Sequence, residues 1–187
     1  RLANLIGFDD APFPRSHRGD VTVIGAVFAA QRLEGVLRGR VRRDGANATR
    51  VLTEMVEASR FDGHIQAVLL QGIALAGFNV VDIHVLHQRL ARPVLVVARR
   101  QPDIAAIRRA LLERVSGGRR KWALIQAAGP MEPVGEVWVQ RAGLSLAQAG
   151  ELIGRSALHS HIPEPLRCAH LIAGGITRAA GGSGQRV

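Results

Sequence analysis

The first forty residues contain three strand-like apolar runs, at 2–8, 21–30 and 34–41, and the second is rich in β-branched residues. This pattern, broken by short polar connections, predicts an antiparallel meander of three strands. Further along, continuous apolar runs are typical of strands that are buried on both faces. The expected strands are 2–8, 21–30, 34–41, 65–70, 94–97, 122–127 and 136–140.

Between the later strands, apolar residues recur at the three- and four-residue spacing of amphipathic helices. Capping residues support the boundaries, since Asn47 or Thr49 and Ser145 can accept hydrogen bonds from a first helical turn. Proline at 102, and at 163 or 165, favours a helix start. The expected helices are 47–60, 80–90, 102–115, 145–158 and 163–172.

The order of these elements predicts an α/β fold. An antiparallel meander followed by parallel strands forms a mixed sheet, and the alternating helices cover both of its faces. The 187 residues, 47% apolar and 21% charged, are enough for one globular domain over 1–187. The glycine-rich segment 179–187 is expected to be a frayed tail.

Charge narrows the class of partner. The formal net charge is +10, and Lys121 is the only lysine among the basic residues. Such a field attracts polyanions, of which nucleic acid is the commonest, although an arginine bias also arises from genome composition or adaptation to heat. Aromatic residues make up only 4% and tyrosine is absent, which argues against a surface that stacks several bases.

Cellular location follows from what the sequence lacks. No apolar run is long enough to span a bilayer, so no membrane partner is expected. The residues before the first strand do not resemble a signal peptide, and the lone Cys168 excludes an internal disulfide framework. We therefore expect a cytoplasmic protein; its oligomeric state is left open, a homodimer included.

Polar side chains at the ends of strand-like runs are the first candidates for chemistry. Asp9 ends the first run, Asp44 follows the third, and Gln71 ends the fourth, where a third carboxylate would complete the layout of ribonuclease H-like nucleases. Mg²⁺ prefers such hard oxygen ligands, and Mn²⁺ can replace it. Ordinary turn chemistry explains an Asp before Gly equally well, and Asp10 can cap the turn that contains Pro12.

Several blocks of sequence make a resemblance specific. The chain resembles the archaeal relatives of endonuclease V that are described as endonuclease dU, over nearly its whole length. This resemblance implies a ribonuclease H-like fold and cleavage of DNA that contains a deaminated base, deoxyuridine above all. The matching blocks are Ile6 to Phe13, Asp44 to Thr49, Leu70 to Asp82, Pro93 to Arg99 and Ile162 to Ala173.

Carried over residue by residue, the resemblance gives Asp9 and Asp44 as metal carboxylates, with Gln71 in place of the third. Arg99 matches a lysine that contacts phosphate, and His170 matches a histidine near the active site. The loop histidine of endonuclease V is replaced by Gly77, and its strand-separating wedge has no counterpart in 37–43. Substrate reading must therefore differ from that of endonuclease V.

The glycine-punctuated loop after Gln71 is the expected pocket for a flipped base, and Asn79 is the expected reader of its Watson–Crick edge. The other residues expected to bind substrate are Gly72, Gly77, Phe78, Arg99 and Arg100. Asp82 is either a helix cap or a substitute for the missing carboxylate.

Two rival functions remain. With one carboxylate of three replaced, the chain is either an endonuclease or a non-catalytic nucleic-acid-binding protein on a ribonuclease H-like scaffold. A structural partner in a repair complex is a third reading.

Overall fold

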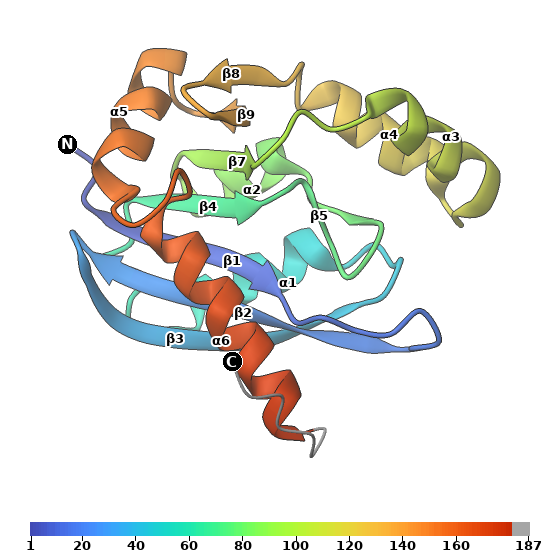
Figure 1. The fold of residues 1–187 in the computed structure, drawn as a ribbon, viewed down its shortest axis with the longest axis horizontal. Coiled ribbons are helices and arrows are strands. Elements are labelled where there is room, and N and C mark those ends of the chain that lie inside the picture. The colour runs from blue at the N-terminus through green and yellow to red at the C-terminus, as the bar shows by residue number, and fades with distance from the viewer. Residues whose placement is uncertain (181–187) are drawn as a thin grey trace.

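The computed structural model describes residues 1–180, and a seven-stranded mixed sheet forms its centre (Figure 1). The strand order is β3-β2-β1-β4-β7-β9-β8. β1, β2 and β3 form the antiparallel meander, β4 and β7 continue β1 in parallel, and β9 and β8 close the sheet in the antiparallel sense. The strands are β1 (Asn4–Asp10), β2 (Asp20–Ala29), β3 (Arg32–Arg42), β4 (Ala67–Gln71), β7 (Val94–Ala98), β8 (Glu132–Val134) and β9 (Val137–Ala142).

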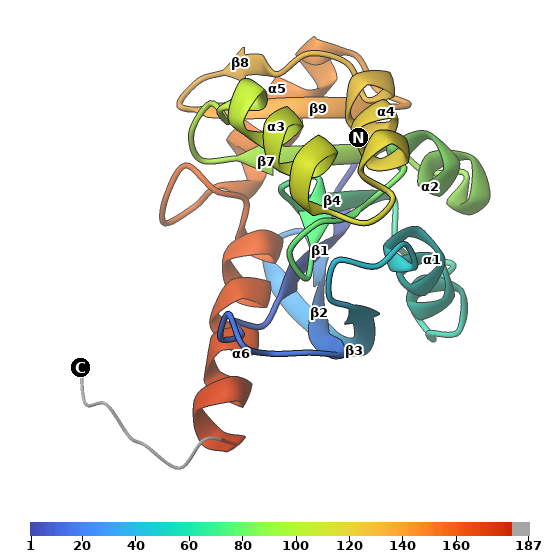
Figure 2. The ribbon, with the colours of Figure 1, turned by 90° about the vertical axis from the view of Figure 1, so that its right-hand side faces the viewer.

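Helices cover both faces of this sheet, as Figure 2 shows in a view along the layers. α1 and α2 pack on one face, α5 and α6 on the other, and α3 with α4 lies beyond the ends of the parallel strands. A small hairpin, β5 (Ala74–Leu75) with β6 (Asn79–Val80), leads into α2. The helices are α1 (Ala48–Glu57), α2 (Ile83–Leu90), α3 (Ile104–Arg114), α4 (Gly118–Ala127), α5 (Leu146–Ser156) and α6 (Glu164–Ala180).

The predicted fold class is confirmed, and one predicted strand is wrong. Residues 122–127, expected as a strand, belong to α4. The buried positions Gly118, Lys121 and Ile125 follow a helical spacing, so the period of burial is that of a helix although the local composition resembles a strand. α6 is longer than expected and includes residues 179 and 180, while the rest of the predicted tail lies outside the described residues.

The capping predictions are confirmed at two helix starts. Ser145 and Gln148 form a reciprocal capping box at the start of α5. Asp82 is the N-cap of α2, where its carboxylate accepts hydrogen bonds from the backbone N–H groups of His84 and Val85. The helix-cap reading of Asp82 is therefore the correct one.

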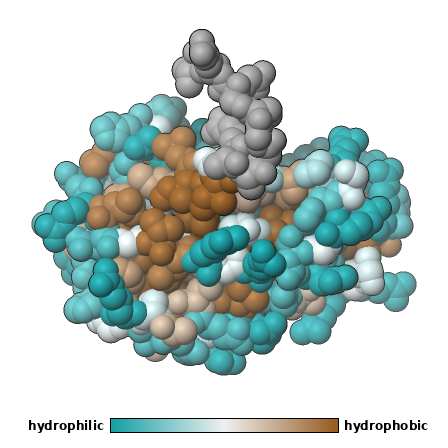
Figure 3. All heavy atoms as spheres, turned by 90° about the horizontal axis from the view of Figure 1, so that it is seen from below, coloured by the Kyte–Doolittle hydropathy of each residue, from teal (hydrophilic) through white to brown (hydrophobic). Residues whose placement is uncertain are grey.

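The outer edge of the sheet is β3, seen from below in Figure 3, where apolar surface is interrupted by hydrophilic side chains. Arg38, Arg40 and Arg42 are exposed at alternate positions of this strand. Charged side chains along an edge strand oppose pairing with the edge of another chain. No helix among residues 1–180 is both long and apolar enough to cross a membrane.

Candidate active site

Alternation along the parallel strands carries three polar side chains to one face of the sheet. Leu5, Leu69 and Leu95 occupy the core under α5 and α6, and every second residue after them points the same way. Phe8 pairs with Leu70, and Gln71 pairs with Val97, so the strands are in register at these ends. Asp9, Gln71 and Arg99 therefore emerge on the α6 side, at the carboxyl ends of β1, β4 and β7.

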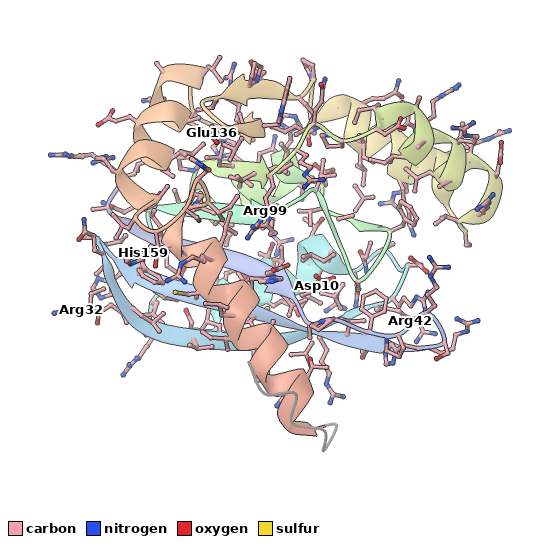
Figure 4. All side chains as sticks on the ribbon, viewed as in Figure 1. Asp10, Arg32, Arg42, Arg99, Glu136 and His159 are labelled. Atoms are coloured by element: carbon pink, nitrogen blue, oxygen red, sulfur yellow. The ribbon has the colours of Figure 1, made fainter. Side chains whose placement is uncertain are left out.

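These side chains line a cleft of about 830 Å³ between the strand ends and α6. Figure 4 labels Asp10 and Arg99 at this end of the sheet, beside α6. The lining residues are Asp9, Asp10, Ala11, Pro12, Phe13, Gln71, Arg99, His170, Leu171 and Gly174. The structure thus brings together Asp9, Gln71, Arg99 and His170, four of the five residues predicted to act in catalysis. Arg100, the next residue after Arg99, is exposed.

Asp9 is the buried acid of the cleft, with 5% of the residue exposed. One of its oxygens accepts a hydrogen bond from the backbone N–H of Asp10 at 2.9 Å, and the other lies 2.9 Å from Nδ1 of His170. Burial, together with the negative charge of Asp10, raises the pKa of Asp9 from 3.8 to about 6, although the bond to His170 opposes this rise. The protein thus holds a poorly solvated carboxylate where a cation would be stabilised.

Close packing of α6 on β1 explains how His170 reaches Asp9. A Cβ on Gly7 would lie 2.4 Å from the carbonyl carbon of Pro165, so only glycine allows the helix to approach so closely. Ala169 and Ala173 pack on the neighbouring strand and fix the rotation of the helix. His170 then points from the helix towards Asp9, and 64% of its side chain remains exposed to the cleft and solvent.

Asp10 is the acidic residue of the cleft that the sequence did not single out for the site. Its Oδ2 accepts a hydrogen bond from the backbone N–H of Ala76 at 2.6 Å, which ties the loop after Gln71 to the end of β1. The pair Asp9-Asp10 at the end of a strand was the feature of the sequence that could have indicated Asp10 as a residue of the site. Alternation along the strand points only one of the two side chains towards α6.

Asp44, which is expected to share a metal with Asp9, is not among the residues that line this cleft. It lines a second cavity, together with Lys121 and residues of α1 and α2. Its Oδ1 accepts a hydrogen bond from the N–H of Phe78 at 2.8 Å, and its own N–H donates to the carbonyl of Ala76 at 2.9 Å. Asp44 thus braces the 72–78 loop from the side opposite Asp10.

The prediction that Asn79 reads a base conflicts with its environment. Asn79 is fully buried, and its Oδ1 accepts from the N–H of Ala48, while its Nδ2 donates to Arg42 O and to Asn47 Oδ1. Both ends of the amide are thus occupied in joining β3, α1 and the loop. Both N–H donors of Asn79 are used and the residue is buried, so in this structure its hydrogen bonds hold these three segments together.

Gly72, Gly77 and Phe78, the other loop residues predicted to bind substrate, line a small and mostly apolar cavity of about 100 Å³ beneath α3 and α4. Gln140 of β9 also lines this cavity and is 2% exposed. Its Nε2 donates to the carbonyl of Gly129 at 2.9 Å, and among residues 1–180 its carbonyl oxygen accepts no hydrogen bond. Gln140 falls within a plain strand pattern, so sequence reasoning had no signal for it.

Within residues 1–180 no three side chains of the types His, Cys, Asp or Glu are grouped so that they could hold a metal ion. His84 and His87, one turn apart on α2, instead bond to the backbone carbonyls of Ala127 and Arg92. Oxygen donors that could face a hard cation in the cleft are therefore limited to the carboxylate of Asp9, the amide carbonyl of Gln71 and the neighbouring Asp10.

Comparisons with known proteins show the family and the fold of this chain. The model of the family described as endonuclease dU matches residues 1–177. A UPF0215 protein of Deinococcus radiodurans is 60% identical over 187 residues, which cover 100% of this chain and 95% of the relative. A crystal structure of an Archaeoglobus fulgidus protein of unknown function is 33% identical and superposes with a TM-score of 0.87 over 93% of this chain and 98% of that one.

Endonuclease V shares the fold at greater distance. The crystal structure of Ciona intestinalis endonuclease V, in complex with a 24mer DNA containing an inosine followed by a ribo-adenosine, is 13% identical and has a TM-score of 0.62. The match covers 96% of this chain and 88% of that one. This likeness confirms the predicted endonuclease V-like fold.

Proposed function

Because the chain belongs to the endonuclease dU family, we propose that it is a metal-dependent endonuclease that nicks DNA containing a deaminated base, with deoxyuridine as the expected lesion. The observation that carries the proposal is the cleft in which Asp9, Gln71 and Arg99 meet His170 at the ends of three parallel strands. An acid, an amide, a guanidinium and an imidazole in one open cleft suit the hydrolysis of a phosphodiester.

The residues present fit a magnesium ion that keeps most of its water. Asp9 is a desolvated carboxylate with a raised pKa, and Gln71 offers a second hard oxygen from the adjacent strand. Mg²⁺ commonly binds through one or two carboxylates and completes its shell with water and substrate phosphate. When bound, such an ion would polarise the phosphate and favour ionisation of a water molecule.

The other cleft residues supply positioning and charge. With Nδ1 of His170 donating to Asp9, Nε2 of the neutral ring is the acceptor that can take a proton from the attacking water. Arg99 stabilises the negative charge that develops on the phosphate while the bond from water oxygen to phosphorus forms and the bond to the leaving oxygen breaks. Gln71 orients a water molecule or coordinates the cation through its carbonyl.

The small cavity behind the loop is proposed to receive the flipped base. Deamination replaces an exocyclic amine with a carbonyl and places a hydrogen on the adjacent ring nitrogen. An acceptor at this edge therefore favours uracil, which presents N3–H, over cytosine, which presents a lone pair there. The unoccupied carbonyl oxygen of Gln140 is such an acceptor, and it takes the place that the sequence had given to Asn79.

Gln140→Met is expected to lower kcat/KM for a uracil-containing duplex about 10- to 100-fold, because a buried polar contact of about 1–3 kcal/mol is lost. Affinity for undamaged DNA should not change, since Gln140 is away from the phosphate cleft. Gln126→Met, at an exposed position of α4, is the control. Equal uracil cleavage by the two variants would remove Gln140 from base recognition.

The proposed function is tested by nicking assays on duplexes that contain uracil, hypoxanthine or only normal bases, with Mg²⁺ or with EDTA. Nicking of the uracil duplex that requires Mg²⁺ is the expected result. Salt-sensitive binding without any nicking would instead favour a non-catalytic nucleic-acid-binding protein. Absence of both would favour a structural role in a complex.

A further inference from the structure

A second cavity, of about 450 Å³, lies on the other side of the 72–78 loop from the cleft. Three helices and the loop after β3 enclose it, and four cationic side chains line it: Arg50 of α1, Arg89 of α2, and Arg120 and Lys121 of α4. The proposed function makes no use of this cavity, and from the sequence the basic run 119–121 is either DNA-facing or merely solvated.

Lys121 is the unusual member of this group. It is the only lysine in the chain and is 5% exposed. Its Nζ donates to the backbone carbonyl of Asp44, and among residues 1–180 this is its only hydrogen-bond partner, so two of its three donors remain unused. Burial lowers the pKa of Lys121, and the charge of Asp44 partly offsets the effect. A buried ammonium with unused donors is costly unless an anion accompanies it.

The carboxylates of the cavity are already engaged. Asp44 accepts from the N–H of Phe78 and lies 3.5 Å from Nε of Arg43, and Asp82 caps α2. Arg89 and Arg120 are exposed and form no ion pair with any residue of 1–180. α4 begins beside the cavity at Gly117, with no side chain capping its amino end, which adds a positive partial charge. Four cationic side chains thus line the cavity against the two carboxylates of Asp44 and Asp82. Arg50 is paired with Glu54, whereas Arg89, Arg120 and Lys121 form no ion pair within residues 1–180.

We infer that this cavity binds a phosphate group, and that the phosphate belongs to the DNA strand that flanks the cleft. The inference rests on the proposed function for its choice of DNA as the source. Lys121 and Arg120 would hold the phosphate oxygens at the start of α4, with Arg89 opposite them on α2. The 72–78 loop, held by Asp10 on one side and Asp44 on the other, separates the two places where the strand is gripped.

The test uses Arg89→Gln/Arg120→Gln, two exposed positions where the change should not affect folding. The matched control is Arg108→Gln/Arg109→Gln on α3, which removes the same charge from exposed positions outside the cavity. Affinity for a uracil-containing duplex is measured in EDTA at several salt concentrations. Loss of this one phosphate contact should reduce the slope of log affinity against log salt by about 0.9, while the control should change it little.

Two further measurements, thermal stabilisation by free phosphate and nicking, distinguish a DNA phosphate from a free phosphate and distinguish this site from the proposed enzyme. If DNA binding matches the control but inorganic phosphate or dUMP stabilises the wild type and not the Arg89/Arg120 variant against heat, the site binds a free phosphate instead. If neither ligand distinguishes the variant from its control, the site is refuted. A reduced salt slope in a protein that never nicks DNA would keep this site and refute the proposed enzyme. Lys121→Met fills a similar space without the charge. When its melting temperature matches that of wild type, it should show the same reduction in the salt slope of DNA affinity.

Discussion

Replacing Asp9 with Asn is expected to abolish nicking of uracil-containing DNA and, without metal, to make the protein more stable. The loss should be roughly a thousandfold or more, because the only buried carboxylate of the cleft would no longer supply negative charge for the cation, an effect of several kcal/mol. Asparagine keeps an oxygen that can accept from the N–H of Asp10, so the backbone should not change.

The gain in stability follows from the raised pKa of Asp9. The pKa of Asp9 is about 6 in the folded protein, above its ordinary value of 3.8. The free energy of unfolding of wild type therefore falls as pH rises from about 4 to about 6 and stays at this lower level above pH 6. A difference of about two pKa units corresponds to at most about 3 kcal/mol. Asp9→Asn removes the penalty, so its advantage should be full above about pH 6 and vanish below about pH 4.

Thermal unfolding in EDTA from pH 4 to pH 8, beside nicking in Mg²⁺, checks both parts. Asp20→Asn, an exposed acid at the start of β2, is the control and should change neither property. Adding Mg²⁺ should raise the melting temperature of wild type more than that of Asp9→Asn. A variant that nicks normally, or that is less stable than wild type in EDTA at pH 8, would contradict the assignment of Asp9 as the acid that needs a cation.

The residues at the ends of the parallel strands were predictable because side chains alternate between the two faces along a strand. Alternation along β1 and β4 fixes which residue follows the last buried one on a given face, so Asp9 and Gln71 could be placed from their strand ends, whereas Arg99 came from the resemblance to a known family. Chain order alone does not make β1 and β4 neighbours, because β2 and β3 lie between them in the sequence. His170 lies 161 positions from Asp9, and only the resemblance to a known family brought it to the site.

The structure departs most from expectation where a side chain hydrogen-bonds to a distant segment. Asn79 follows a loop, as a substrate-reading residue often does, but it is buried and its two donors bond to Arg42 and Asn47. Asp44 follows a strand, as a metal ligand does, but that strand is two positions from β1 in the sheet, and the Asp44 carboxylate accepts a hydrogen bond from the loop after β4. Sequence shows that such groups are polar and lie beside turns, but it does not show which donors surround them.

The second prediction concerns Asp44. Its hydrogen bond to Phe78 favours a role in positioning the 72–78 loop over a role as a metal ligand. Asp44→Asn keeps an acceptor for the N–H of Phe78, and Asn tolerates the left-handed backbone at this residue, where φ is +51°. This variant should therefore nick within about threefold of wild type. Its lost attraction to Arg43, at 3.5 Å on the partly exposed surface, is worth little.

Asp44→Gly separates the backbone from the side chain, because glycine also adopts positive φ but offers no acceptor. The Phe78 N–H would then lack a partner and the 72–78 loop would lose one of its two side-chain hydrogen bonds to Asp10 and Asp44, so nicking should fall about 10- to 100-fold for a contact of about 1–3 kcal/mol. If Asp44 instead held the cation, Asp44→Asn would be as inactive as Asp9→Asn, because a neutral amide is the poorer ligand. Single-turnover nicking by the three variants decides the matter, and equal loss in Asp44→Asn and Asp9→Asn would return Asp44 to the metal site.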